Sequence, residues 1–176
     1  MSNNHGEVRR HHRTGRSLAF CAIASLVAVG CGGGSALAAR CGDVVTEDLD
    51  PTWTVHLLPG AATPQYMSDP PTSGPHFAAE PVTGTRHETL DDPLQMTVLE
   101  VGGVLLQYRP DDVTGTDLAR LERLSNDAVV VAPDPTLPDA VVATAWVTKQ
   151  SCEGIDIDSL ATFIEEHGGS GPGIAG

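Results

Sequence analysis

The chain has 176 residues, of which 40% are hydrophobic and 19% charged, and its formal net charge is −13. Four of its ten basic residues and one of its 23 acidic residues lie in the first 30 positions, which leaves six basic and 22 acidic residues and a net charge of −16 for the rest. So acidic a surface repels polyanions and anionic lipid headgroups, which argues against nucleic acid or an anionic membrane surface as a partner.

Residues 1–40 are typical of a sorting segment. Four arginines lie within residues 1–16 and precede an uncharged, largely apolar run from Ser17 to Gly30. A basic stretch before a short apolar run is the form that a secretory signal takes. The run of 14 residues is shorter than the roughly 20 that cross a bilayer as a helix, which makes a permanent transmembrane anchor the weaker interpretation. We therefore expect the folded part of the chain to lie outside the cytoplasm.

Two cleavage sites are compatible with this segment. Ala28-Val29-Gly30-Cys31 resembles a bacterial lipobox, although leucine is usual where Ala28 stands, and it would make Cys31 a lipidated N-terminus. Three glycines directly after Cys31 would then act as a flexible tether, which favours the lipoprotein. The alternative is Ala36-Leu37-Ala38, an ordinary signal-peptidase site that would release a soluble protein. Contact with a membrane is expected only through the N-terminal lipid.

Both cleavage schemes leave the same two cysteines in the folded part, Cys41 and Cys152. Two cysteines in an oxidising compartment predict one disulfide. Closing so long a loop is worth about 4–5 kcal/mol in the chain-entropy model. Metal binding by this pair is the weaker alternative, because neither cysteine has a ligand-type residue at the usual short spacing.

The first half of the folded part is rich in turn-forming residues. Residues 53–58 have strand character, whereas residues 59–84 hold six prolines and predict a long, ordered irregular loop. The apolar runs 94–100 and 103–108 are separated by two residues, Val101 and Gly102. This pattern predicts two strands that meet at a tight turn or bulge.

Residues 41–167 predict a single α+β domain, a small and mainly antiparallel sheet with two helices on one face. Thr116 is the expected N-cap of a helix that buries leucines 118, 121 and 124, and residues 128–132 and 140–147 are expected strands. A last helix is expected from Asp156 or Asp158 to His167, ended by Gly168, before a flexible tail over residues 168–176.

His76 is the first candidate site residue. It follows Pro70, Pro71 and Pro75, which fix their own φ angles, and a rigid loop that ends on a titratable side chain is a common way to place a functional group. The alternative is that His76 only donates hydrogen bonds that hold the loop together. Thr72 and Ser73 in the same loop are candidate binding residues, and Ser73 lacks the G-x-S-x-G frame of a nucleophile elbow.

Glu100 and His56 complete the candidate set. Glu100 lies in an apolar run, where a carboxylate must be paired or hydrogen-bonded. Glu100 is either a ligand or general base, or it has a structural role as the partner of an arginine such as Arg109 or as a cap on loop amides. His56 adjoins an expected strand end and, taken alone, has a structural explanation.

The run Tyr66-Met-Ser-Asp-Pro-Pro-Thr-Ser-Gly-Pro-His76-Phe77 is the most distinctive part of the chain. Together with Leu99-Glu100-x-Gly102-Gly103-Val104, Tyr108-Arg109-Pro110 and Thr144-Ala145-Trp146, it resembles the family catalogued as domain of unknown function 3105. The resemblance covers roughly residues 56–167. It implies an exported or membrane-tethered bacterial protein, and it implies no activity.

One segment departs from the pattern of that family. Members usually read H-x-L-E-H-G where this chain has Thr97-Val-Leu-Glu100-Val101-Gly102. Histidines that converge with a glutamate would indicate a transition-metal site, for copper or zinc. This chain keeps only His56, His76 and Glu100 of such a ligand set.

No phosphate-binding loop, dinucleotide fingerprint, H-E-x-x-H or C-x-x-C motif is present. The leading hypothesis is a non-catalytic, extracytoplasmic domain that binds a partner, small ligand or metal ion through the loop around His76 and Glu100. An enzyme that uses these two residues as an acid–base pair is the second hypothesis, and it requires both side chains to reach a common site. The third is a structural relative that kept the fold and lost the site.

Overall fold

A computed structural model describes residues 40–174 of the chain. The sorting segment, its cleavage sites and the proposed lipidation of Cys31 lie outside the described residues. Within residues 40–174, no helix combines the length and the apolar character needed to cross a bilayer.

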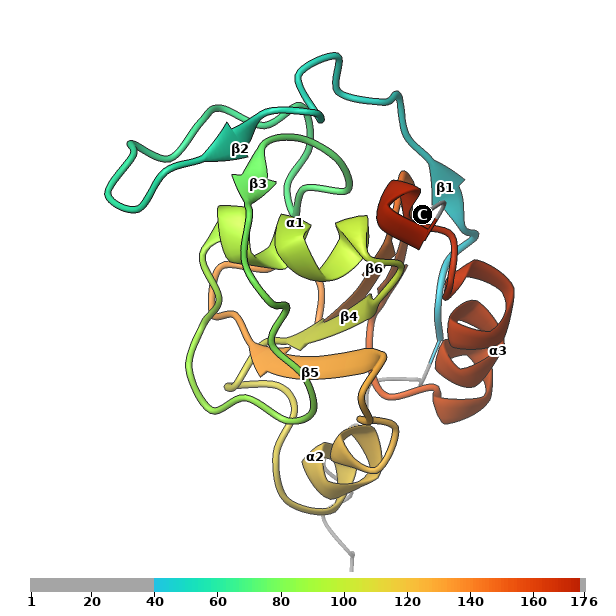
Figure 1. Ribbon diagram of the computed structural model, residues 1–176. Coiled ribbons are helices and arrows are strands. Elements are labelled where there is room, and N and C mark those ends of the chain that lie inside the picture. The colour runs from blue at the N-terminus through green and yellow to red at the C-terminus, as the bar shows by residue number, and fades with distance from the viewer. Residues whose placement is uncertain (1–39, 175–176) are drawn as a thin grey trace, which may run out of the picture. The chain divides into compact units, whose positions relative to one another are not determined.

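A five-stranded sheet forms the centre of the fold (Figure 1). Its spatial order is β1-β7-β6-β4-β5, and every neighbouring pair is antiparallel except β4 and β5, which run parallel. The strands are β1 (Val45–Thr46), β4 (Val104–Tyr108), β5 (Val129–Pro133), β6 (Val141–Ala145) and β7 (Thr148–Cys152). The predicted α+β class with a mainly antiparallel sheet is confirmed.

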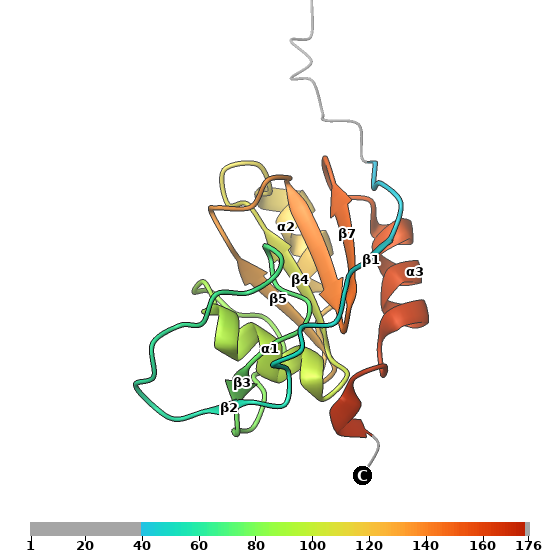
Figure 2. The ribbon, with the colours of Figure 1, turned by 90° about the horizontal axis from the view of Figure 1, so that it is seen from above.

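Helices cover both faces of this sheet (Figures 1 and 2). The helices α2 (Gly115–Glu122) and α3 (Ile157–His167) cover one face, as expected for the two predicted helices. A third helix, α1 (Asp92–Glu100), covers the other face. The sheet is therefore the middle layer of three.

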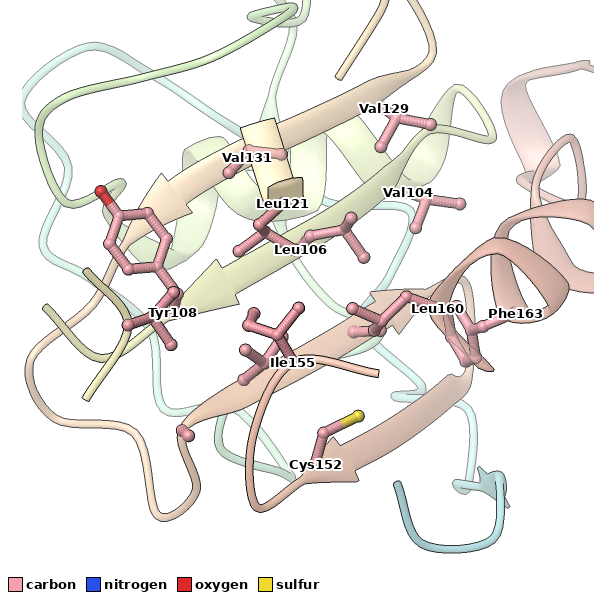
Figure 3. Close-up of a cluster of buried hydrophobic side chains, with 14 of the residues drawn as sticks. Val104, Leu106, Tyr108, Leu121, Val129, Val131, Cys152, Ile155, Leu160 and Phe163 are labelled. Atoms are coloured by element: carbon pink, nitrogen blue, oxygen red, sulfur yellow. The ribbon is translucent and has the colours of Figure 1, made fainter. Parts of the chain in front are cut away.

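Because both faces are covered, β4, β5 and β6 are buried along their whole length. Alternate residues of β4, namely Val104, Leu106 and Tyr108, join Leu121 of α2 and Leu160 of α3 in one core (Figure 3). Leu105 instead packs in the second core with residues of α1. A strand buried on two faces reads as a continuous apolar run, which is why these strands could be predicted.

Residues 94–100 were expected to form a strand, and this expectation is wrong, because they belong to α1. The Asp91 side chain caps the helix by accepting a hydrogen bond from the Leu94 amide at 3.0 Å, and Pro93 lies in the first turn, where proline is tolerated. Gly102, at φ +79°, follows the C-terminal end. A short apolar run does not distinguish a buried helix from a strand, and here the cap and the proline decide.

Other boundaries also differ from the expectations. The N-cap of α2 is Thr114 rather than Thr116, and α3 begins after its Asp156 cap and ends at Gly168 as predicted. The chain turns at Val147, at φ +54°, and returns as β7, which the sequence did not predict. Strand β7 was missed because it reads Thr-Lys-Gln-Ser-Cys, with little apolar character.

The predicted disulfide between Cys41 and Cys152 is confirmed. It joins the start of the described chain to the end of β7, and Cys152 is fully buried in the core beside α3. Strand β1 pairs with β7 nearby, and the Lys149 ammonium lies 2.7 Å from the Glu47 carboxylate. The first strand is therefore held by a covalent bond, a short ladder and an ion pair.

We predict that replacing both cysteines by alanine lowers the free energy of unfolding by up to about 4–5 kcal/mol, because the unfolded chain is then no longer closed across 111 residues. Urea denaturation of the oxidised wild type and of the double variant measures the difference. Equal denaturation midpoints with equal slopes would contradict the prediction.

We also predict an acid-sensitive contribution from Glu47. Burial alone would raise its pKa, but hydrogen bonds from Lys149 and Ser68 outweigh burial and lower the pKa below the ordinary value of 4.5. The ionised form is thus favoured in the folded state, so this stability is present above pH 4.5 and is lost as the pH falls through the lowered value.

Glu47→Gln should therefore be less stable than the wild type at pH 7, by less than about 1 kcal/mol, and the difference should shrink toward pH 3. Asp48→Asn removes the same charge from an exposed neighbour and serves as the control. A Glu47→Gln difference that does not change with pH would refute the assignment.

Candidate functional site

His76 lies at the end of a loop that is fixed from several sides. Residues 70–76 are buried, although the loop has little regular structure. The Tyr66 hydroxyl donates a 2.7 Å hydrogen bond to the Pro75 carbonyl, and the Asp50 amide donates a 2.9 Å bond to the Ser73 hydroxyl oxygen. Burial and the carboxylate of Asp92 raise the pKa of Tyr66, which keeps its hydroxyl protonated as a donor.

Thr72 and Ser73, predicted as binding residues, are both buried and hold this loop in place. The Val147 amide donates a 3.0 Å hydrogen bond to the Thr72 carbonyl, which joins the loop to the turn before β7. Ser73 accepts the bond from Asp50. Both residues therefore help to hold the loop in its conformation.

The His76 side chain is 2% exposed, and its two ring nitrogens have different surroundings. Nδ1 lies 3.1 Å from the Gly74 carbonyl oxygen, which can only accept, so Nδ1 carries a proton. Nε2 is buried without a hydrogen-bond partner and lies 4.0 Å from a carboxylate oxygen of Glu100. A hydrogen bond from Nδ1 is enough to hold the loop together, which leaves Nε2 without a structural role.

Glu100 is the last residue of α1, and 22% of its side chain is exposed. A carboxylate at a helix C-terminus opposes the helix dipole, so the helix gains nothing from it there. Arg109, considered as its partner, instead pairs with Asp112 and donates to the Leu137 carbonyl. Among the described residues, His76 is the only ion-pair partner of Glu100 within 4.0 Å.

His56 joins the pair from the neighbouring strand. Strands β2 (His56–Leu57) and β3 (His76–Phe77) form a small parallel sheet in which His56 stands opposite His76. The two rings meet edge to face, with centroids 4.7 Å apart, and His56 is exposed. His76 therefore lies close to Glu100 on one side and to His56 on the other, but in the described part of the chain no three His, Cys, Asp or Glu side chains are grouped so that they could hold a metal ion.

The C-terminal segment lies over Glu100, a contact that was not predicted from the sequence. The Gly169 amide donates to the Gly102 carbonyl, and the segment continues into η1 (Pro172–Ile174). A Cβ at Gly171 would lie 2.2 Å from the Glu100 carbonyl oxygen, and one at Gly173 would lie 2.9 Å from its carboxylate. The glycines, which suggested a flexible tail, allow this backbone to approach the end of α1.

Thr97 and Val101 stand at the two positions where the resemblance described above led us to expect histidine. The Thr97 hydroxyl donates to the Pro93 carbonyl at 2.9 Å and accepts from the Phe77 amide at 3.2 Å. It therefore ties α1 to the residue after His76. Val101 is 39% exposed and caps the end of α1.

Four of the surface cavities in the described region are lined by residues other than His56, His76 and Glu100. The arrangement can accept hydrogen bonds, hold a cation, or exchange a proton between Nε2 and the carboxylate.

We predict that Gly74→Ala disrupts this site. Gly74 has φ +143°, which disfavours a side chain, and a Cβ there would lie 2.7 Å from the Tyr66 ring. The free energy of unfolding should fall by about 2 kcal/mol or more, and the His76 ring resonances should shift. Gly60→Ala, at φ +82° with nothing within 4 Å, is the matched control for backbone strain. Equal losses in the two variants would mean that the contact with Tyr66 does not matter.

Comparison with known proteins identifies the family and nothing finer. The model of the family described as "Protein of unknown function (DUF3105)" matches residues 60–174. This range includes the loop of residues 70–76, called the Pro-rich loop below, as well as the five-stranded sheet apart from β1 and the helices α1, α2 and α3. No curated protein and no solved structure matches the chain. This chain belongs to the DUF3105 family.

Proposed function

We propose that this protein is an exported domain of the cell envelope that binds a ligand without changing it chemically. The binding surface is formed by the end of the Pro-rich loop and the C-terminal end of α1. The observation that carries the proposal is the buried Nε2 of His76, which has no partner and faces the Glu100 carboxylate at 4.0 Å.

A buried polar atom without a partner costs free energy, and a ligand that supplies the missing partner recovers it. The backbone around His76 is fixed by hydrogen bonds from Tyr66 and Asp50, so little order has to be gained on binding. Glu100 provides a second acceptor at the surface. The proposed ligand therefore brings a hydrogen-bond donor or a positive charge.

The location outside the cytoplasm is part of the same proposal. The apolar run after four arginines supports export. The buried disulfide supports an oxidising compartment, since such bonds are rare in proteins that stay in the cytosol.

One observation favours the enzyme as a second candidate function. The 4.0 Å between His76 and Glu100 is short enough for both groups to reach one substrate atom. Against it, a catalytic pair works in a pocket that encloses the substrate, and four of the cavities in the described region are lined by other residues.

The test uses the full chain, produced with export and purified from the envelope fraction. Its melting temperature is measured with and without the small-molecule fraction of an envelope extract, beside Glu100→Ala and an Asp48→Ala control. We expect the extract to stabilise the wild type and the control but not Glu100→Ala, and the bound compound to be recovered unchanged by mass spectrometry.

If the protein instead converts the bound compound into a product over repeated turnovers, it is an enzyme. If the extract changes the melting temperature of none of the three proteins, this surface has no binding role and a structural domain is favoured.

A further inference from the structure

We propose that Nε2 of His76 and the carboxylate of Glu100 hold a transition-metal cation of the zinc and copper class, with the exposed ring of His56 beside them as a further ligand. This inference rests on the proposed function, because it names the chemical class of the ligand for the same surface.

The tautomer of His76 is the first argument. A metal-bound histidine typically donates its other ring N–H to a carbonyl or carboxylate, which fixes the ring and directs the free lone pair at the metal. In His76, Nδ1 faces the Gly74 carbonyl at 3.1 Å, and Nε2 is the nitrogen without a partner. The carbonyl belongs to the rigid loop, so the direction of the lone pair is set by the backbone.

The separation of the two acceptors is the second argument. At 4.0 Å, Nε2 and the Glu100 oxygen are too far apart for a direct hydrogen bond, which is about 2.9 Å long. Zinc lies about 2.0–2.1 Å from a histidine nitrogen and about 2.0–2.2 Å from a carboxylate oxygen, so an ion between the two atoms reaches both. At this separation the ion lies almost on the line between the two atoms, so a tetrahedral angle requires the Glu100 side chain to bring its oxygen closer to Nε2.

The charge balance is the third argument. An imidazole that carries its single proton on Nδ1 directs the Nε2 lone pair toward the carboxylate, and two such acceptors repel unless a proton or a metal cation lies between them. Glu100 stands at the negative end of α1, and in the described residues no lysine or arginine lies within 4.0 Å of it. A cation would interact favourably with the Nε2 lone pair, with the negative charge of the carboxylate and with the negative end of the α1 dipole.

The proposed ion would have coordination positions that the protein does not fill. His56 stands opposite His76 in the small parallel sheet, with the ring centroids 4.7 Å apart, and its side chain is exposed. A nitrogen and oxygen ligand set suits zinc and copper. Since the described residues offer no ready-made group of three ligands, water or a group from another molecule fills the remaining positions. Such a site binds its ion reversibly and leaves a position for a second ligand.

The test is calorimetric titration of the disulfide-intact full chain with Zn²⁺ and, separately, with Cu²⁺. Every protein carries His5, His11 and His12 replaced by alanine, so that the N-terminal segment adds no background. The variants are Glu100→Gln and His76→Gln, and His87→Gln, an exposed histidine elsewhere, is the matched control. We expect one ion per chain for the parent and the control, and an affinity at least about tenfold weaker for both site variants.

Because His76 is buried, its replacement can unfold the protein, whereas Glu100 is partly exposed and its variant should stay folded. Melting curves check this, and the ¹⁵N resonance of His76 Nε2 in the parent should shift on adding Zn²⁺. Absence of binding, or binding that a folded Glu100→Gln variant retains in full, would overturn the metal site. Retention of an organic ligand from the envelope extract without any metal binding would leave the proposed function standing and reject only this inference.

Discussion

The burial of β4 on both faces is the constraint on which the rest of the fold depends. A central apolar strand in a sheet this small needs cover from two directions, and only α1 provides it on the side opposite α2 and α3. The Gly103 amide bonds to the Val98 carbonyl, so the helix turns directly into the strand that it covers. The position of the C-terminal end of α1, and with it Glu100, follows from core packing.

The site is thus built from two parts with different physical origins. Glu100 is placed by hydrophobic packing, whereas His76 is placed by hydrogen bonds between the Pro-rich loop, Asp50 and the turn at Val147. Thr97 joins the two parts through the Phe77 amide. Trp53 meets Trp146 edge to face, with ring centroids 5.9 Å apart, and this contact anchors the segment that leads to the loop on the same core as α1. Neither His76 nor Glu100 is held by the other.

The sequence predicted those features that leave a local signal. Continuous apolar runs revealed β4, β5 and β6, and an aspartate with a helical period revealed α3. The sequence did not reveal α1, because its apolar run is as short as a strand. It did not reveal β7 either, because the polar residues of that strand are buried only through tertiary pairing. His76 and Glu100 were identified from proline stiffness and from a carboxylate in an apolar run. The contact of the C-terminal glycines with Glu100 has no local signal, because glycine permits close approach and disorder alike.

The disulfide has a mechanical consequence. Cys41 lies one residue after the start of the described chain, and Cys152 lies only a few residues before α3. A pulling force applied between the two ends of the protein would pass from Cys41 through the sulfur bridge to Cys152 and on to α3. Residues 42–151, which contain most of the sheet, the Pro-rich loop and Glu100, lie within the closed loop and would not carry this tension along their backbone. The C-terminal segment that contacts Glu100 lies outside the loop, so a load on the C-terminus would reach the site only through that contact.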